Sequence, residues 1–235
     1  DARTVTLSKP TTVTYLGATG SEYSDLTLLA ARVTGADGSP VPNGEAVTFT
    51  LGTQTCAGRT LLFGYAVCLL TVEQPAGSYT LGVSYGGDST YAASTASVPF
   101  TVEHEEAVVH VTTGPALAGS TVTLTATLLQ DGIRPVSGRT LTLSLGSRAC
   151  SATTDASGVA GCPVAAPTTL GPTAATASFA GDDDYAADSD SGQAIVYAWA
   201  PGGGSFVVGD RSASGTVTFW GSQWAKENIL SSGSA

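Results

Sequence analysis

Apolar residues alternate with polar ones along several short stretches of the first hundred residues. This period of two is typical of β-strands that bury one face. Clusters of Gly, Pro, Asn and Asp separate the stretches, and no segment shows sustained helical periodicity. The residues expected to share buried faces are Thr27, Leu29, Ala31 and Val33, then Val47, Phe49 and Leu51, and then Tyr79, Leu81, Val83 and Tyr85.

The same pattern returns in the second half of the chain. Cys56 and Cys68 recur as Cys150 and Cys162, both 94 residues later. Each copy offers about seven short strands over about 90 residues, which predicts an immunoglobulin-like β-sandwich. The buried faces expected in this copy are Val122, Leu124, Ala126 and Leu128, then Leu141, Leu143 and Leu145, and then Ala175, Ala177 and Phe179.

The sequence therefore predicts an all-β protein with two tandem immunoglobulin-like β-sandwiches and a C-terminal β-hairpin tail. The first domain spans residues 1–103, the second spans residues 104–198, and a Gly/Ser linker with the hairpin tail occupies residues 199–235. The second domain has Ala175 and Ala177 where the first has Leu81 and Val83. Since each buried methylene stabilises by about 0.8 kcal/mol, we expect the second domain to be the less stable.

The four cysteines have the same spacing in both copies. Of the three possible pairings, only Cys56 with Cys68 and Cys150 with Cys162 repeats one bond in both domains. We interpret these pairs as structural disulfides, which indicate an oxidising compartment and hence a secreted or cell-surface protein. Zinc binding and free thiols are the alternatives. The short spacing, and the lack of Trp in residues 1–198, argue against a bond across the two sheets in the antibody manner.

Composition excludes several classes of function. The net charge is −10 and no stretch clusters Lys or Arg, so nucleic acids and anionic membrane surfaces are poor partners. No run of 18 apolar residues is present to span a bilayer. The chain has two His, at 104 and 110, and no Gly-x-Ser-x-Gly motif, so we predict that it is not an enzyme.

A Gly-Asp loop occurs at the same place in both copies. We interpret its Gly as a positive-φ position, its Asp as an acceptor for turn amides and its Tyr as cover for the end of the sandwich. The structural turn residues are Gly87, Asp88 and Tyr91, and Gly181, Asp182 and Tyr185. The alternative is calcium binding in the second copy, where the candidate ligands are Asp182, Asp183, Asp184, Asp188 and Asp190. No other cofactor is predicted.

Both ends of the chain carry segments that suit contacts with other molecules. Residues 3–8 are either the first strand of domain 1 or an orphan strand that completes a neighbouring subunit by edge addition. Residues 206–220 read as a hairpin too small to bury a core alone. The candidate interface residues are Val5, Leu7, Phe206, Val208, Phe219, Trp220 and Trp224. Exposed Trp side chains also suit stacking on glycans, which is the alternative role.

The segments Ser84–Tyr91, Gly44–Gly52 and Asp155–Gly158 resemble the bacterial Ig-like repeat family. The resemblance covers residues 12–198, and its most specific element is Tyr-x-Gly-Asp-x-x-Tyr, present as Tyr85–Tyr91. Repeats of this family occur as tandem arrays in secreted and cell-surface proteins, where they act as stalks or adhesion modules. The resemblance implies no catalytic residues.

Together these observations predict an extracellular structural or adhesive protein. Its Ig-like repeats would act as a stalk or as the subunit of a surface filament, and its partners would be other subunits, other surface proteins or glycans. The alternative is a carbohydrate- or calcium-binding accessory module of a larger secreted protein.

Overall fold

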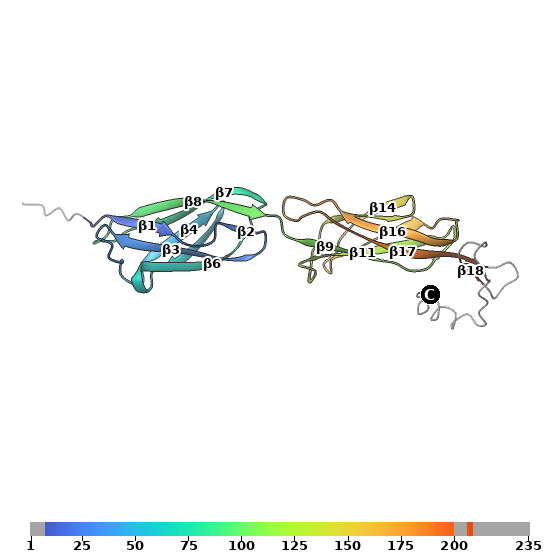
Figure 1. Cartoon of the computed structure of the whole chain (residues 1–235), viewed down its shortest axis with the longest axis horizontal. Coiled ribbons are helices and arrows are strands. Elements are labelled where there is room, and N and C mark those ends of the chain that lie inside the picture. Colours follow the sequence, from blue (N-terminus) through green and yellow to red (C-terminus); the bar gives the residue numbers. More distant parts are fainter. Residues whose placement is uncertain (1–7, 200–205, 209–235) are drawn as a thin grey trace, which may run out of the picture. The chain divides into compact units, whose positions relative to one another are not determined.

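The computed structural model describes residues 8–199 and 206–208 of the chain. Contacts divide the chain into two units (Figure 1). The first comprises Asp1–Glu105 with Asp183–Tyr185, and the second comprises Glu106–Asp182 with Ala186–Ala235. The secondary structure of the described residues is strand, apart from one short 3-10 turn, η1 at Leu62–Gly64. The all-β class that the alternation predicts is therefore confirmed.

The first unit is a sandwich of two sheets. One sheet has the order β1-β3-β6 and the other has the order β2-β8-β7-β4-β5. Neighbouring strands are antiparallel, except that β2 runs parallel to β8. The strands are β1 (Thr11–Tyr15), β2 (Gly20–Glu22), β3 (Leu26–Gly35), β4 (Ala46–Leu51), β5 (Gln54–Arg59), β6 (Tyr65–Thr71), β7 (Gly77–Tyr85) and β8 (Ser94–Glu103).

The core of the first unit lies between these sheets. Alternation turns Leu29, Ala31 and Val33 of β3 inward, and all three are fully buried. They meet the inward residues of β4, β7 and β8, among which Phe49 and Phe100 are the largest apolar side chains besides Tyr85. Because a strand's period is two, the same alternation turns the intervening residues of β3 and β6 away from the core.

The second unit repeats this arrangement. One sheet has the order β10-β17-β16-β13-β14, with β18 beside β17, and the other has the order β12-β11-β15, with β9 beside β11. The strands are β9 (Ala107–Thr112), β10 (Ala116–Leu117), β11 (Thr121–Gln130), β12 (Arg134–Pro135), β13 (Thr140–Leu145), β14 (Arg148–Thr153), β15 (Val159–Ala165), β16 (Gly171–Phe179), β17 (Asp188–Trp199) and β18 (Phe206–Val208).

The strand predicted at residues 206–208 is present as β18, which pairs antiparallel with Tyr197–Trp199 of β17. The second strand of the predicted hairpin, residues 216–220, lies outside the described residues, as does the segment 3–8. Phe219, Trp220, Trp224, Val5 and Leu7 are therefore not placed by the structure.

The two cores differ in size at matched positions. Ala175 and Ala177 are fully buried where Leu81 and Val83 fill the first unit, and Ala194 takes the place of Phe100. Fewer buried methylenes mean less apolar area removed from water. We expect the full chain to unfold in two thermal transitions, the second unit melting first.

Scanning calorimetry of two matched variants assigns these transitions. Leu143→Ala should lower the midpoint of the first transition, and Phe49→Ala should lower that of the second, since each leaves a core cavity costing about 2–5 kcal/mol. Residues 49 and 143 occupy corresponding strands, β4 and β13. A lower transition that moves with Phe49→Ala would reverse the predicted order of stability.

Candidate interaction face

The outward side of β3 and β6 in the first unit is apolar. Leu26 and Leu28 project from β3 on the side opposite the buried Thr27 and Leu29. Their register sets Leu28 beside Leu69 of β6. Antiparallel sheets ordinarily present polar residues on the side that faces solvent. An exposed apolar side is therefore a candidate interaction surface.

The neighbouring strand β6 supplies the rest of the sheet face. Tyr65, Val67 and Leu69 point outward while Ala66 and Cys68 point into the sandwich. The cross-strand partners of Tyr65 and Val67 on β3 are Arg32 and Ala30. Side chains at such paired positions touch one another, so the apolar surface is continuous across the two strands.

The loop before β6 extends this surface. Leu61, Leu62 and Phe63 are all exposed, Phe63 at 68%. Phe63 has φ of 63°, a left-handed conformation that costs a bulky residue about 1–2 kcal/mol. The amide of Leu61 donates to Tyr65 O (2.6 Å), and Arg32 Nε donates to Phe63 O (3.0 Å). The loop is thus held in a strained shape that displays its aromatic ring.

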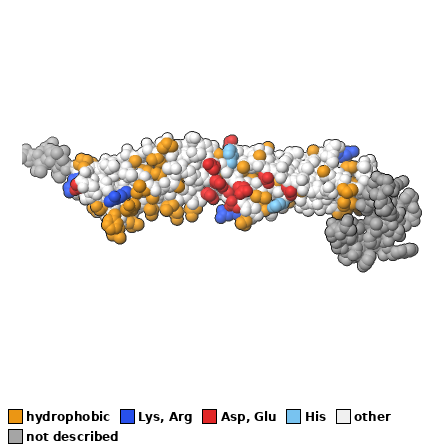
Figure 2. Space-filling model, viewed as in Figure 1, with side chains coloured by type: hydrophobic (Ala, Val, Ile, Leu, Met, Phe, Trp, Pro, Cys, Tyr) orange, Lys and Arg blue, Asp and Glu red, His pale blue; other side chains and the backbone are white. Residues whose placement is uncertain are grey.

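We define the apolar face as eight residues of the first unit, and Figure 2 shows hydrophobic side chains gathered over this region. They are Leu26, Leu28, Leu61, Leu62, Phe63, Tyr65, Val67 and Leu69. Their exposed fractions run from 41% to 69%. For side chains of about 150–250 Å² each, this corresponds to on the order of 800 Å² of exposed area, above the roughly 300–600 Å² typical of a monomer's largest patch.

The described residues of the second unit form no such face, although its strands have the same register. Leu29 lies opposite Cys68 in the first unit as Leu124 lies opposite Cys162 in the second. At the positions of Leu26 and Leu28 the second unit therefore has Thr121 and Thr123. The sandwich fold does not require an apolar outer side, since the second unit forms without one.

The outward residues of β6 and its preceding loop also differ between the units. Val67 and Leu69 correspond to Gly161 and Pro163. The loop Leu61–Gly64 corresponds to Asp155–Gly158, an ordinary turn in which Asp155 Oδ1 accepts the amides of residues 157 and 159 (2.8 and 3.0 Å). Leu61 thus takes the place of Asp155, whose side chain stabilises the turn in the second unit.

Charge is sparse on the apolar face. The outward residues of β1, β3 and β6 include no Asp or Glu, although the chain carries a net charge of −10. Their one cation is Arg32, whose guanidinium lies 5.6 Å from the centre of the Tyr65 ring. This cation–π contact holds the Arg side chain against the sheet. The face can therefore meet another apolar surface without burying a carboxylate.

The sequence pattern alone did not predict this face. The signal was present in the run Tyr65–Leu70, in which six consecutive residues are apolar. A strand of an antiparallel sheet with apolar residues at both odd and even positions has two apolar sides, of which the core covers one. The repeat distinguishes the two sides, because the second copy has Thr121 and Thr123 at the positions of the outward Leu26 and Leu28.

The cysteines form the bonds Cys56–Cys68 and Cys150–Cys162. Cys56 lies on β5 and Cys68 on β6, which belong to different sheets. The bond therefore joins the two sheets, as an antibody disulfide does, but it does so between edge strands. The expectation that no disulfide joins the two sheets is therefore wrong, although the bond links edge strands and not the central strands that the antibody disulfide joins.

The Gly-Asp loops have the following geometry. Gly87 has φ of 74° and Gly181 has φ of 78°. Asp88 Oδ1 accepts the amides of Thr90 and Tyr91, both at 2.6 Å. In the second unit Asp182 Oδ2 lies 2.7 Å from Arg139 Nε, an ion pair. Tyr185 is buried and Tyr91 is partly buried.

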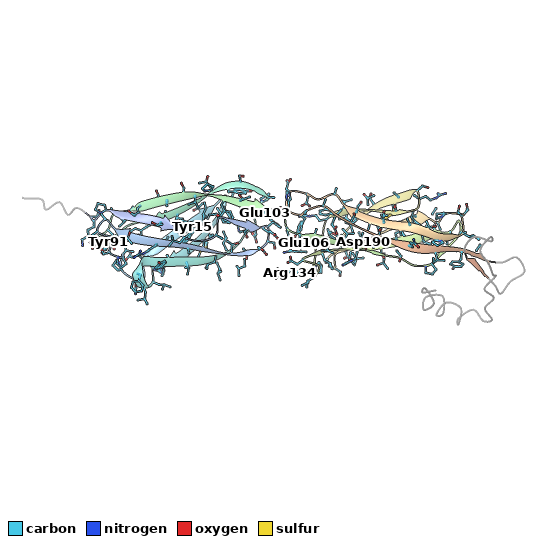
Figure 3. All side chains as sticks on the ribbon, viewed as in Figure 1. Tyr15, Tyr91, Glu103, Glu106, Arg134 and Asp190 are labelled. Atoms are coloured by element: carbon cyan, nitrogen blue, oxygen red, sulfur yellow. A yellow bond between two sulfur atoms is a disulfide. The ribbon has the colours of Figure 1, made fainter. Side chains whose placement is uncertain are left out.

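Two of the other candidate acids, Asp188 and Asp190, act within the sandwich. Asp188 and Asp190 lie on β17, where Figure 3 labels Asp190. Asp188 Oδ2 accepts the Val109 amide (2.7 Å), and Asp190 Oδ2 accepts the Val111 amide (2.9 Å). In the described part of the chain no three His, Cys, Asp or Glu residues group closely enough to hold a metal ion. Calcium binding stays a prediction that titration has to test.

Acid should weaken the link between β17 and β9. The hydrogen bond from the Val111 amide, with a second from Ser191, lowers the pKa of Asp190 below its usual 3.8. Because the folded-state pKa is depressed, its stabilising contribution is present above the unfolded pKa and is lost as pH falls through the folded pKa. We expect Asp190→Asn to destabilise the second unit more at pH 7 than at pH 2.5, by urea denaturation. An equal difference at both pH values would contradict this.

The structure does not place the side chains of the remaining predicted interface. Phe206 and Val208 lie on β18, and only their backbone is described. Glycan stacking on the tail aromatics likewise stays a prediction. Among the described residues, no helix has the length and apolar character needed to cross a membrane.

The sequence matches no protein-family model and no curated protein. Several solved structures are similar to it. The adhesin InvE of Yersinia pseudotuberculosis shares 18% identity over 77% of this chain and 58% of its own, with a TM-score of 0.42. Invasin, described as a bacterial integrin-binding protein, shares 17% identity over 80% of this chain and 39% of its own, with a TM-score of 0.50.

The likeness to invasin, taken with the two sandwiches, decides the fold. The fold is immunoglobulin-like. This confirms the architecture predicted for the two repeats of the chain. The chain spans less than two thirds of the length of InvE and of invasin.

Proposed function

We propose that this chain is a segment of an extracellular adhesive protein, in which one Ig-like unit carries a contact surface and the other serves as a spacer. The observation that carries the proposal is the difference between the units. Both have the same sheets and a disulfide at the same place, yet only the first bears an apolar face among the described residues. Selection for folding alone would act on both outer sides alike, so the difference indicates a separate task.

The extracellular location is supported by the two disulfides. Each joins strands of opposite sheets, and such structural bonds persist in oxidising compartments and are rare in the cytosol. The fold is also shared with invasin, a bacterial integrin-binding protein. The polar Thr-rich outer side of the second unit suits a solvated spacer.

The described residues offer a contact surface and no grouping suited to turnover. Of the titratable residues that the sequence singled out, Asp188 and Asp190 accept strand amides and Asp182 forms an ion pair. We therefore propose a non-enzymatic stalk or filament subunit, with its specificity in the first unit.

Location and role can be tested on cells that produce the protein. An antibody raised against the folded chain should label intact cells, and deletion of the coding region for residues 8–199 should lower the fraction of cells retained on a surface under flow. Label that appears only after permeabilisation would overturn the extracellular assignment. Unchanged retention in the deletion strain would overturn the adhesive role. Neither outcome depends on how the chain associates with itself.

A further inference from the structure

We propose that the apolar face of the first unit is covered by the same face of a second copy, so that the chain forms a twofold-symmetric dimer through β3, β6 and the loop at Leu61–Gly64. The inference does not depend on the proposed function. It rests on area, on charge and on the distribution of apolar surface along the chain.

The area of the apolar face suits an interface between two copies. The apolar face exposes on the order of 800 Å², and a standard stable interface buries about 800 Å² on each partner. Small-molecule sites are concave, whereas this face is the outer side of a sheet. Two sheet faces of this kind can pack about 10 Å apart with interdigitated side chains, as sheets do within a sandwich.

The apolar face carries no acidic residue that a contact would bury. A chain with a net charge of −10 repels its own copies, and carboxylates buried unpaired in the contact surface would add a desolvation cost to that repulsion. The outward residues of β1, β3 and β6 avoid this cost, because none is Asp or Glu. Arg32 is the one cation among them, and its contacts with the Tyr65 ring and Phe63 O keep it within its own sheet.

The surface of a second copy that best matches the apolar face is the same face. Of the large apolar side chains exposed in the described residues, only Ile133 belongs to the second unit. Within residues 8–199, a second copy therefore presents one comparable apolar surface, which is the same face. Packing that face on itself gives an isologous contact, which closes at two subunits. Packing it on the Thr-rich side of the second unit would bury hydroxyls against leucines, at a cost for each unpaired group.

The experiment is sedimentation equilibrium of the full chain, with its disulfides intact, from about 1 to 100 µM. We expect a mass twice that of the 23.4 kDa chain at high concentration, with reversible dissociation on dilution. The test variant is Leu26→Thr with Leu28→Thr, which installs the residues found at Thr121 and Thr123. Thr is a favourable strand residue, so the sandwich should fold, which the thermal midpoint checks.

The dimer dissociation constant of this variant should rise at least about a hundredfold, since four leucines leave each interface. The matched control is Ile133→Thr, which removes an exposed apolar side chain outside the face and should leave the constant unchanged. A wild-type chain that stays at 23.4 kDa throughout would overturn the proposal. A double-threonine variant with unaltered association would overturn it as well.

The chain's own tail is the other candidate occupant, and a third variant distinguishes it. Trp220→Ser with Trp224→Ser should leave the dimer intact if the face packs on itself. If this change dissociates the dimer while the threonine variant retains it, association runs through the tail and the proposal is wrong. Larger assemblies that persist in the threonine variant would also overturn it.

Discussion

Replacement of Gly64 by alanine is expected to lower the free energy of unfolding of the first unit by at least about 3 kcal/mol. Gly64 ends the loop that displays Phe63 and has φ of 78°. A Cβ built at Gly64 would overlap the carbonyl oxygen of Val33, a buried residue of β3. The substitution therefore adds left-handed strain to a backbone clash, and neither can be relieved without moving β3.

A matched control separates these two causes. Gly38 has φ of 80°, yet a Cβ built there would meet nothing within 4 Å. Gly38→Ala should cost only the conformational part, about 1–2 kcal/mol. Urea denaturation of both variants measures the difference. Equal destabilisation would show that the approach to Val33 carries no cost and that the loop is free to shift.

The repeat offers an independent check of the same prediction. Gly158 corresponds to Gly64, with φ of 74° and a built Cβ 2.6 Å from Leu128 O. Gly158→Ala should destabilise the second unit as Gly64→Ala destabilises the first. The loops share this glycine conformation although their other residues differ completely, so glycine serves the fold while Leu61, Leu62 and Phe63 serve the surface.

The strands of both cores could be predicted from the sequence because one face of each is buried. Leu29, Ala31 and Val33 are fully buried as the alternation predicts, and so are Leu141, Leu143 and Leu145. Burial of one face fixes the register, since a shift by one residue would expose the whole set. The repeat offset strengthened the prediction, because the same spacing occurred twice.

Short polar strands could not be predicted in this way. Gly20–Glu22 forms β2 only through parallel pairing with Thr101–Glu103 of β8. Such pairing depends on backbone groups and on residues about 80 positions away, and it leaves no period in the local sequence. The ion pair of Asp182 with Arg139 escaped prediction for the same reason.

The candidate site escaped for a different reason. Alternation identifies which residues share a side of a strand. In the run Tyr65–Leu70 both sides are apolar, so the sequence does not show which side faces the core. The candidate interface predicted from the sequence included the tail aromatics, whose side chains the structure does not place. The disulfide resolves the ambiguity, because Cys68 bonds to Cys56 at the edge of the sandwich and turns Val67 and Leu69 outward.

Loss of a disulfide is the second change with a large expected effect. Each bond closes a separation of 12 residues, and a loop of this length corresponds to about 3 kcal/mol in the chain-entropy model. Cys68 and Cys162 are buried, so alanine is the replacement that leaves no unpaired polar group. We expect Cys56→Ala with Cys68→Ala, and Cys150→Ala with Cys162→Ala, each to destabilise its own unit by about this amount.

The consequence should differ between the units, because their cores differ. Single domains have a free energy of unfolding of only about 5–15 kcal/mol. We expect the value to be lower for the unit with Ala175 and Ala177 in its core, so the same loss unfolds that unit more readily. The Cys150/Cys162 variant should therefore populate an unfolded second unit at temperatures where the Cys56/Cys68 variant stays folded. Chemical denaturation with and without reductant measures this: reductant should reproduce each variant's loss in the wild type and leave the substituted unit unaffected. If reductant lowered neither midpoint, the bonds would contribute nothing, and the repeated cysteines would need an explanation outside stability.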